Sequence, residues 1–124
     1  MGLFDYLMGN LSEVANPEAL EKRLAPLLVE GEILEHAYQL WRDQLLFTNK
    51  RLIVVDKQGV TGTKVEWRSI PYRSIEQFSA ETAGLLDMDS ELVLYVRGTA
   101  PLRLEFRRGS NLNSVMQTLA KYVL

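Results

Sequence analysis

The arrangement of apolar residues after Gly31 is the feature that most constrains the fold. From this glycine to about residue 108, short segments rich in β-branched and aromatic residues alternate with turn residues at intervals of about ten. This spacing is typical of a meander or barrel of antiparallel strands joined by short turns. The pattern predicts a sheet over residues 31–108, with seven strands near 32–41, 43–48, 51–56, 64–68, 75–79, 91–96 and 102–107.

The periodicity changes over residues 110–124, where apolar positions recur every three or four residues. This spacing predicts an amphipathic helix with one continuous apolar face. Because the face can be buried only against the preceding sheet, we expect the helix to cap an open end or one face of a bent barrel. The apolar positions are Leu112, Val115, Met116, Leu119, Ala120 and Val123.

Residues 1–28 are expected to form an N-terminal helical extension. Asn16 and Pro17 suit a helix start, since the first can cap the helix and the second can occupy its first position, and Pro26 is expected to end it. Before this helix lies an apolar stripe that has to be covered by its own domain, another subunit or a membrane surface. Membrane is the least favoured, because the stripe lacks a basic polar face. The stripe comprises Leu3, Phe4, Leu7, Met8, Leu11 and Val14.

The composition fits one cytoplasmic domain spanning residues 1–124. With 14 basic and 16 acidic side chains the formal net charge is -2, which gives no general attraction to nucleic acid. The absence of cysteine excludes disulfides and thiolate metal sites and fits a reducing compartment. Asp5 interrupts the short N-terminal apolar segment, so a secretory signal is not expected, and no apolar run approaches the roughly 20 residues that span a bilayer.

No residue pattern predicts catalysis, a cofactor or a metal ion. His36 is the single histidine, so one chain can form neither a catalytic triad nor a histidine-rich metal site, and we expect it to be an ordinary strand residue. The acidic run over residues 87–91 superficially resembles a calcium loop but lacks the central glycine and the distal glutamate. We expect a solvated turn there, with a surface for a partner as the alternative.

Basic residues gather around the third and fourth predicted strands, where they could hold phosphate or anionic lipid headgroups. Acidic residues are interleaved with them and the net charge is negative, which favours a solvated or protein-facing surface instead. The basic residues are Lys57, Lys64, Arg68 and Arg73, and the acidic ones are Asp56, Glu66 and Glu76.

The segment Leu92-Val93-Leu94-Tyr95-Val96 is apolar at every position. Such a strand favours burial on both faces, and one sheet with one helix covers one face, so a neighbouring subunit is expected to cover the other. Large aromatic residues are also enriched at interfaces, although for Trp41 burial in the core is favoured over an interface. The predicted subunit contacts are Leu3, Phe4, Trp41, Val93 and Tyr95.

Several motifs follow one another in a specific order. They are Phe47-Thr48-Asn49-Lys50-Arg51-Leu52-Ile53, Asp56-Lys57-Gln58-Gly59-Val60-Thr61-Gly62, Ser69-Ile70-Pro71-Tyr72-Arg73-Ser74-Ile75, and Glu81-Thr82-Ala83-Gly84 with Asp87, Asp89, Glu91 and Leu92. The combination resembles the bacterial pleckstrin-homology-like (PH-like) family over nearly the whole chain. The resemblance implies a bent seven-stranded sheet capped by a helix, no known catalysis, and cyclic rings of identical subunits. It does not by itself imply lipid binding, because function does not follow from fold.

We therefore expect a mainly β, PH-like domain that acts as a non-catalytic, ring-forming scaffold or adaptor in the cytoplasm. Another protein is expected to bind a polar surface between adjacent subunits, and a peripheral module that binds anionic lipid headgroups is the alternative. The residues expected at the polar surface are Lys64, Arg68, Arg73, Glu81, Asp87 and Asp89.

Overall fold

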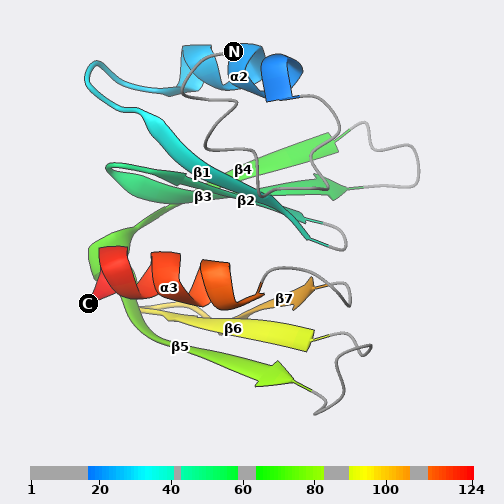
Figure 1. Cartoon of the computed structure of the whole chain (residues 1–124), viewed down its shortest axis with the longest axis vertical. Coiled ribbons are helices and arrows are strands. Elements are labelled where there is room, and N and C mark those ends of the chain that lie inside the picture. The colour runs from blue at the N-terminus through cyan, green and yellow to red at the C-terminus, as the bar shows by residue number, and fades with distance from the viewer. Residues whose placement is uncertain (1–16, 41–42, 59–63, 83–89, 107–111) are drawn as a thin grey trace.

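The computed structural model describes residues 17–40, 43–58, 64–82, 90–106 and 112–124 (Figure 1). The seven predicted strands and the C-terminal helix are present, and the mainly β class is confirmed. Of the predicted N-terminal helical extension the structure shows a short helix that ends before Pro26 as expected, while the apolar stripe of residues 3–14 lies outside the described residues. In chain order the elements are α2 (Pro17–Leu24), the 3-10 turn η1 (Ala25–Leu27), β1 (Leu34–Gln39), β2 (Asp43–Thr48), β3 (Arg51–Gln58), β4 (Lys64–Pro71), the 3-10 turn η2 (Tyr72–Ser74), β5 (Ile75–Thr82), β6 (Ser90–Val96), β7 (Leu102–Phe106) and α3 (Leu112–Val123).

The strands form two antiparallel sheets. The first sheet has the order β1-β2-β3-β4 and the second has the order β5-β6-β7. The chain passes from one sheet to the other through η2, directly after Pro71 ends the edge strand β4. Proline lacks a backbone donor and suits this position. The predicted bend of the sheet is therefore a corner where hydrogen bonding between strands stops.

The helix α3 closes the space between the two sheets, as the sequence predicts (Figure 1). Val115 and Leu119 are fully buried, and Tyr122 stacks on Tyr72 of η2 with a centroid distance of 4.7 Å. The hydroxyl of Tyr38 on β1 lies 2.8 Å from the Ser114 hydroxyl, which ties the helix to the first sheet. The inner faces of both sheets and the apolar face of α3 thus share one core.

The helix α2 covers the opposite face of the first sheet (Figure 1). Its residues Leu20 and Leu24 are buried in the hydrophobic core, and the Arg23 guanidinium lies 5.2 Å from the ring centroid of Trp67 on β4. Consequently the first sheet is buried on both faces. This explains why β2 and β3 each contain a run of consecutive apolar residues. The buried positions of these runs are Leu45, Leu46 and Phe47 on β2 and Leu52, Ile53, Val54 and Val55 on β3.

Candidate interaction surface

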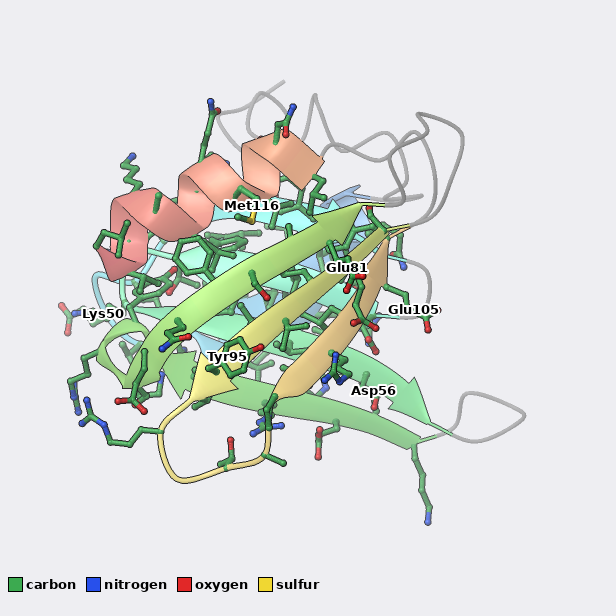
Figure 2. All side chains as sticks on the ribbon, turned by 90° about the horizontal axis from the view of Figure 1, so that it is seen from below. Lys50, Asp56, Glu81, Tyr95, Glu105 and Met116 are labelled. Carbon is green, nitrogen blue, oxygen red and sulfur yellow. The ribbon has the colours of Figure 1, made fainter. Side chains whose placement is uncertain are left out.

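The outer face of the second sheet is a mixed polar and apolar surface that we call the open face. Side chains alternate between the two faces of a strand. On β6 this alternation sends Leu92 and Leu94 into the core and leaves Glu91, Val93 and Tyr95 on the outside. None of the described helices packs on this face, which Figure 2 shows from the outside. By strand register it comprises Gln77, Ser79, Glu81, Glu91, Val93, Tyr95, Arg103 and Glu105.

Strand register places three glutamates in one row across the open face. Glu81 pairs with Glu91 on β6, and Glu91 pairs with Glu105 on β7. Like charges directly opposite each other destabilise a sheet. Arg103 offsets part of this repulsion, since its Nη1 donates to Glu91 Oε1 at 2.9 Å. Glu81 and Glu105 are exposed at the edges of the row, so the open face has an acidic end (Figure 2).

Val93 and Tyr95 were predicted as subunit contacts, and both lie on the open face. Val93 is 5% exposed, and its cross-strand neighbours are Ser79 and Arg103. Tyr95 is 36% exposed, which makes it one of the few large apolar side chains left in contact with solvent among the described residues. On the outer face of β6, Tyr95 is therefore the apolar side chain left to solvent, whereas Val93 is covered by its neighbours.

The other predicted interface residues, Leu3, Phe4 and Trp41, lie outside the described residues. The same holds for Asp87 and Asp89 of the predicted partner surface.

The remaining predicted partner residues do not form one cluster. Lys64 and Arg68 share a face of β4, whereas Arg73 lies in η2 beyond the other end of this strand. At about 3.3 Å per residue, Lys64 lies about 26 Å from Tyr72, the first residue of η2. Glu81 belongs to the other sheet, at the acidic end of the open face. Within one chain these residues therefore do not form one compact surface.

A buried ion pair, which the sequence did not predict, fastens the N-terminal extension to the first sheet. The Glu32 side chain is 1% exposed and accepts hydrogen bonds from Arg51 Nε at 2.8 Å and from the Thr48 hydroxyl at 2.6 Å. Arg51 also donates to the Leu27 carbonyl at 2.6 Å and to Ser69 Oγ at 3.0 Å. The guanidinium thus joins the segment after α2 to β3 and β4.

The pKa of Glu32 reflects this environment. Burial alone would raise the pKa of the carboxyl, but hydrogen bonds from Arg51, from Thr48 and from the Val29 N–H lower it below its ordinary value of 4.5. Glu32 is therefore ionised in the folded protein, and its charge is compensated within the fold. Its role is structural, since all its contacts are with elements that hold the first sheet together.

His36 is half-buried in β1, where it stacks on Tyr38 and meets the edge of Phe47. Burial and the nearby Lys121 lower its pKa below 6.5, although Glu35 acts in the opposite direction. Within the described residues, no three His, Asp or Glu side chains are grouped so that they could hold a metal ion. These contacts are those of a packing residue.

The pKa of His36 gives a testable pH dependence. Because the unfolded chain binds the proton more readily, the free energy of unfolding is expected to decrease as the pH falls below about 6.5. His36→Gln should remove this component between pH 7.5 and 5.5, which urea unfolding at several pH values would measure. An unchanged pH slope in the variant would contradict the assignment.

Comparison with known proteins agrees with this architecture. The profile of the bacterial PH domain matches residues 2–123. The uncharacterized protein YjqA of Bacillus subtilis (strain 168) is 45% identical over 122 residues, which cover 97% of each chain. The uncharacterized protein YozO of the same organism is 40% identical over 102 residues, covering 82% of this chain and 88% of YozO. No helix among the described residues has the length and apolar character to cross a membrane.

Solved structures give the same assignment. The pleckstrin homology domain from Shewanella amazonensis SB2B is 48% identical with a TM-score of 0.80, over 99% of both chains. A DUF1696 family protein with a pleckstrin-homology domain from Shewanella loihica PV-4 is 44% identical with a TM-score of 0.76, over 89% of this chain and 95% of that one. The resemblance of the motifs is confirmed by these matches, and the chain belongs to the bacterial PH domain family.

Proposed function

We propose that this protein is a non-catalytic assembly module that associates with copies of itself through the open face and thereby presents a surface for another protein. The observation that supports the proposal most directly is the uncovered second sheet. The first sheet is covered on both faces by parts of the chain, whereas the outer face of β5-β6-β7 carries the exposed ring of Tyr95 without a covering helix in the described chain. Large uncovered apolar groups within a polar rim are typical of protein interfaces.

The predicted partner residues fit this proposal in one respect. Lys64 and Arg68 on β4 and Glu81 on β5 belong to different sheets. Association of subunits could bring such separated groups into one composite polar surface. Lipid binding by the basic residues has less support, because the exposed Glu66 lies between Lys64 and Arg68 on the same face of β4.

Size-exclusion chromatography with light scattering tests the self-association. The wild-type protein is expected to elute at a multiple of its 14.2 kDa chain mass. Tyr95→Asp should shift it to the monomer, because a buried unpaired carboxylate at an interface is costly and would lie near the glutamate row. Tyr95→Phe, which keeps the ring, is the matched control and should assemble like the wild type. A wild-type protein that stays monomeric at the highest concentration tested would refute the proposal.

The adaptor role has a separate test. Wild-type protein immobilised on a support should retain a protein from extract that the Lys64→Glu/Arg68→Glu variant does not retain. The wild type and the variant should have the same subunit number. Equal retention by the two would remove these residues from the partner surface.

A further inference from the structure

The segment between α2 and β1 presents three aliphatic side chains to solvent. Leu27 is 41% exposed, Val29 is 57% exposed and Ile33 is 53% exposed. We call residues 27–33 the apolar loop. Single exposed apolar residues are common on protein surfaces, but several within one short segment are typical of a contact with a partner or a membrane.

Hydrogen bonds hold the apolar loop in this conformation. The Val29 N–H donates to Glu32 Oε1 at 3.1 Å. The Asn49 side chain accepts from the Ile33 N–H at 2.8 Å and donates to the Gly31 carbonyl at 3.0 Å. The fold therefore keeps the aliphatic groups in solvent, and docking through them requires little further ordering of the chain.

Basic side chains border the apolar loop on the side of the sheets. Lys50 is exposed in the β2–β3 turn, directly after the Asn49 that holds the loop. Arg73 is exposed in η2, which is fixed to the same turn because the Tyr72 hydroxyl donates to the Thr48 carbonyl at 2.6 Å. The loop, the turn and η2 are thus connected by hydrogen bonds into one surface.

The chain enters the apolar loop from another basic segment. The last turn of α2 carries Lys22 and Arg23, and both side chains are exposed. The exposed Glu30 lies within the loop and offsets one of the surrounding charges. The whole chain has a formal net charge of -2, so an excess of cations around the loop is a local property of this end of the molecule.

The parts of this surface face the same way. The apolar loop, the β2–β3 turn and η2 lie along one side of the molecule, on the left in Figure 1. All of them are connections at the ends of strands or helices. A flat partner that approaches this side therefore meets aliphatic and basic groups together.

The chemistry of this surface favours a lipid bilayer over a protein. The residues that dominate protein interfaces energetically are mostly Trp, Tyr and Arg, whereas Leu and Val are under-represented. The exposed apolar groups of the loop are all aliphatic. Peripheral membrane binding combines apolar side chains at the boundary between headgroups and acyl chains with basic side chains that attract anionic lipids. The apolar loop and its basic border provide both.

We propose that the apolar loop docks on the surface of a bilayer that contains anionic lipids. Val29 and Ile33 enter the boundary between headgroups and acyl chains, while Lys50 and Arg73 lie at the charged headgroups. This contact does not depend on the proposed self-association. It also differs from the sequence-based alternative of lipid binding along β4, since Lys64 takes no part in it.

Co-sedimentation with vesicles tests the contact. The wild type is expected to bind vesicles of phosphatidylcholine mixed with phosphatidylglycerol more tightly than vesicles of phosphatidylcholine alone, and added salt should weaken the binding. Lys50→Glu/Arg73→Glu should lower the partition coefficient by more than about twentyfold, at about fivefold for each basic residue. Val29→Asp/Ile33→Asp should lower it by more than about tenfold, because the aliphatic surface is lost.

The matched controls keep the chemistry of each group. Lys50→Arg/Arg73→Lys preserves the charges and Val29→Leu/Ile33→Leu preserves the aliphatic side chains, so both should bind the mixed vesicles like the wild type. All these side chains are exposed, and circular dichroism checks that each variant is folded.

Other occupants of the surface give other results. A wild type that binds neither kind of vesicle, or both equally, would overturn the inference. So would an equal loss of binding in Lys64→Glu/Arg68→Glu, because net charge or β4 would then explain the effect. If Val29→Asp/Ile33→Asp bound vesicles normally but changed the subunit number or lost a protein retained from extract, the loop would be a protein contact and the inference would be wrong.

The same samples separate this inference from the proposed function. Light scattering reports the subunit number of each variant, and sedimentation reports vesicle binding. A monomeric wild type that binds the mixed vesicles refutes self-association and supports the membrane contact. An assembled wild type that ignores the vesicles does the opposite.

Discussion

Arg51→Met is expected to lower the free energy of unfolding by about 3–5 kcal/mol, because it leaves the Glu32 carboxylate buried without its cation. Glu32 is 1% exposed, and Arg51 provides two of its hydrogen bonds, at 2.8 and 3.0 Å. The substitution also leaves the Leu27 carbonyl without its 2.6 Å donor. Urea unfolding at pH 7 would measure the loss.

An exposed ion pair in the same molecule provides the control. Arg103→Met breaks the ion pair with Glu91, whose N–O distance of 2.9 Å is similar but which lies on the surface. We expect this variant to lose no more than about 1 kcal/mol of unfolding free energy. Glu32→Gln/Arg51→Met should recover part of the stability lost in Arg51→Met, because it removes the uncompensated charge. If Arg51→Met and Arg103→Met lost the same unfolding free energy, burial would not be the reason for the large effect expected at Arg51.

The pH dependence gives a second test of the Glu32–Arg51 pair. The folded-state pKa of Glu32 lies below 4.5, so its contribution to stability is complete above pH 4.5 and is lost as the pH falls through the folded pKa. Arg51→Met removes the charge and the hydrogen bonds of the guanidinium while burial remains, so the pKa of Glu32 is expected to be higher in the folded variant than in the folded wild type, and protonation costs the variant less. The difference in stability between wild type and variant should therefore narrow as the pH is lowered from 7 to 4.

Phe47→Ala is expected to cost about 3–5 kcal/mol, the range for removing a fully buried aromatic ring. Phe47 has no exposed surface and lies where β1, η2 and α3 meet. Its ring packs edge-on against Tyr38 with a centroid distance of 5.8 Å and stacks near Tyr122 at 6.1 Å. Thermal and urea unfolding would measure the cost.

The same substitution should loosen α3 in particular, because Tyr122 loses one of its two stacking partners. Relative to wild type, hydrogen exchange in the variant is expected to speed up more for the amides of α3 than for those of β3. Phe47→Leu, which keeps most of the volume, is the control and should cost less than half as much. A loss below about 1 kcal/mol for Phe47→Ala would show that this site is not the joint between helix and sheet.

Local periodicity was sufficient to predict the elements. The alternation around Val65 and Trp67 predicted β4, and the three- and four-residue spacing from Leu112 to Val123 predicted α3. Strand ends differ by up to three residues, because the hydrogen-bonded ladder extends beyond the apolar positions, as at Pro71 and Thr82.

Pairing between distant segments was not predictable in the same way. The row of Glu81, Glu91 and Glu105 depends on the register of three strands, which no local pattern specifies. The Glu32–Arg51 pair joins the segment before β1 to the start of β3, two parts of the chain that meet only once the sheet has formed. One feature of the sequence does indicate the packing of α2. The uninterrupted apolar run of β2 is typical of a sheet covered on both faces, and α2 provides the second cover.

The three-layer arrangement around the first sheet has a consequence for synthesis of the chain. Because domains emerge N-terminus first, α2 is available to shield the outer side of β2 and β3 as soon as these strands form. The inner side of the same strands, including Phe47, waits for α3, which is made at the other end of the described chain. A nascent chain that ends before Leu112 therefore has one face of the first sheet covered and the other exposed. Chaperones and proteases would act on the chain in this partly covered state.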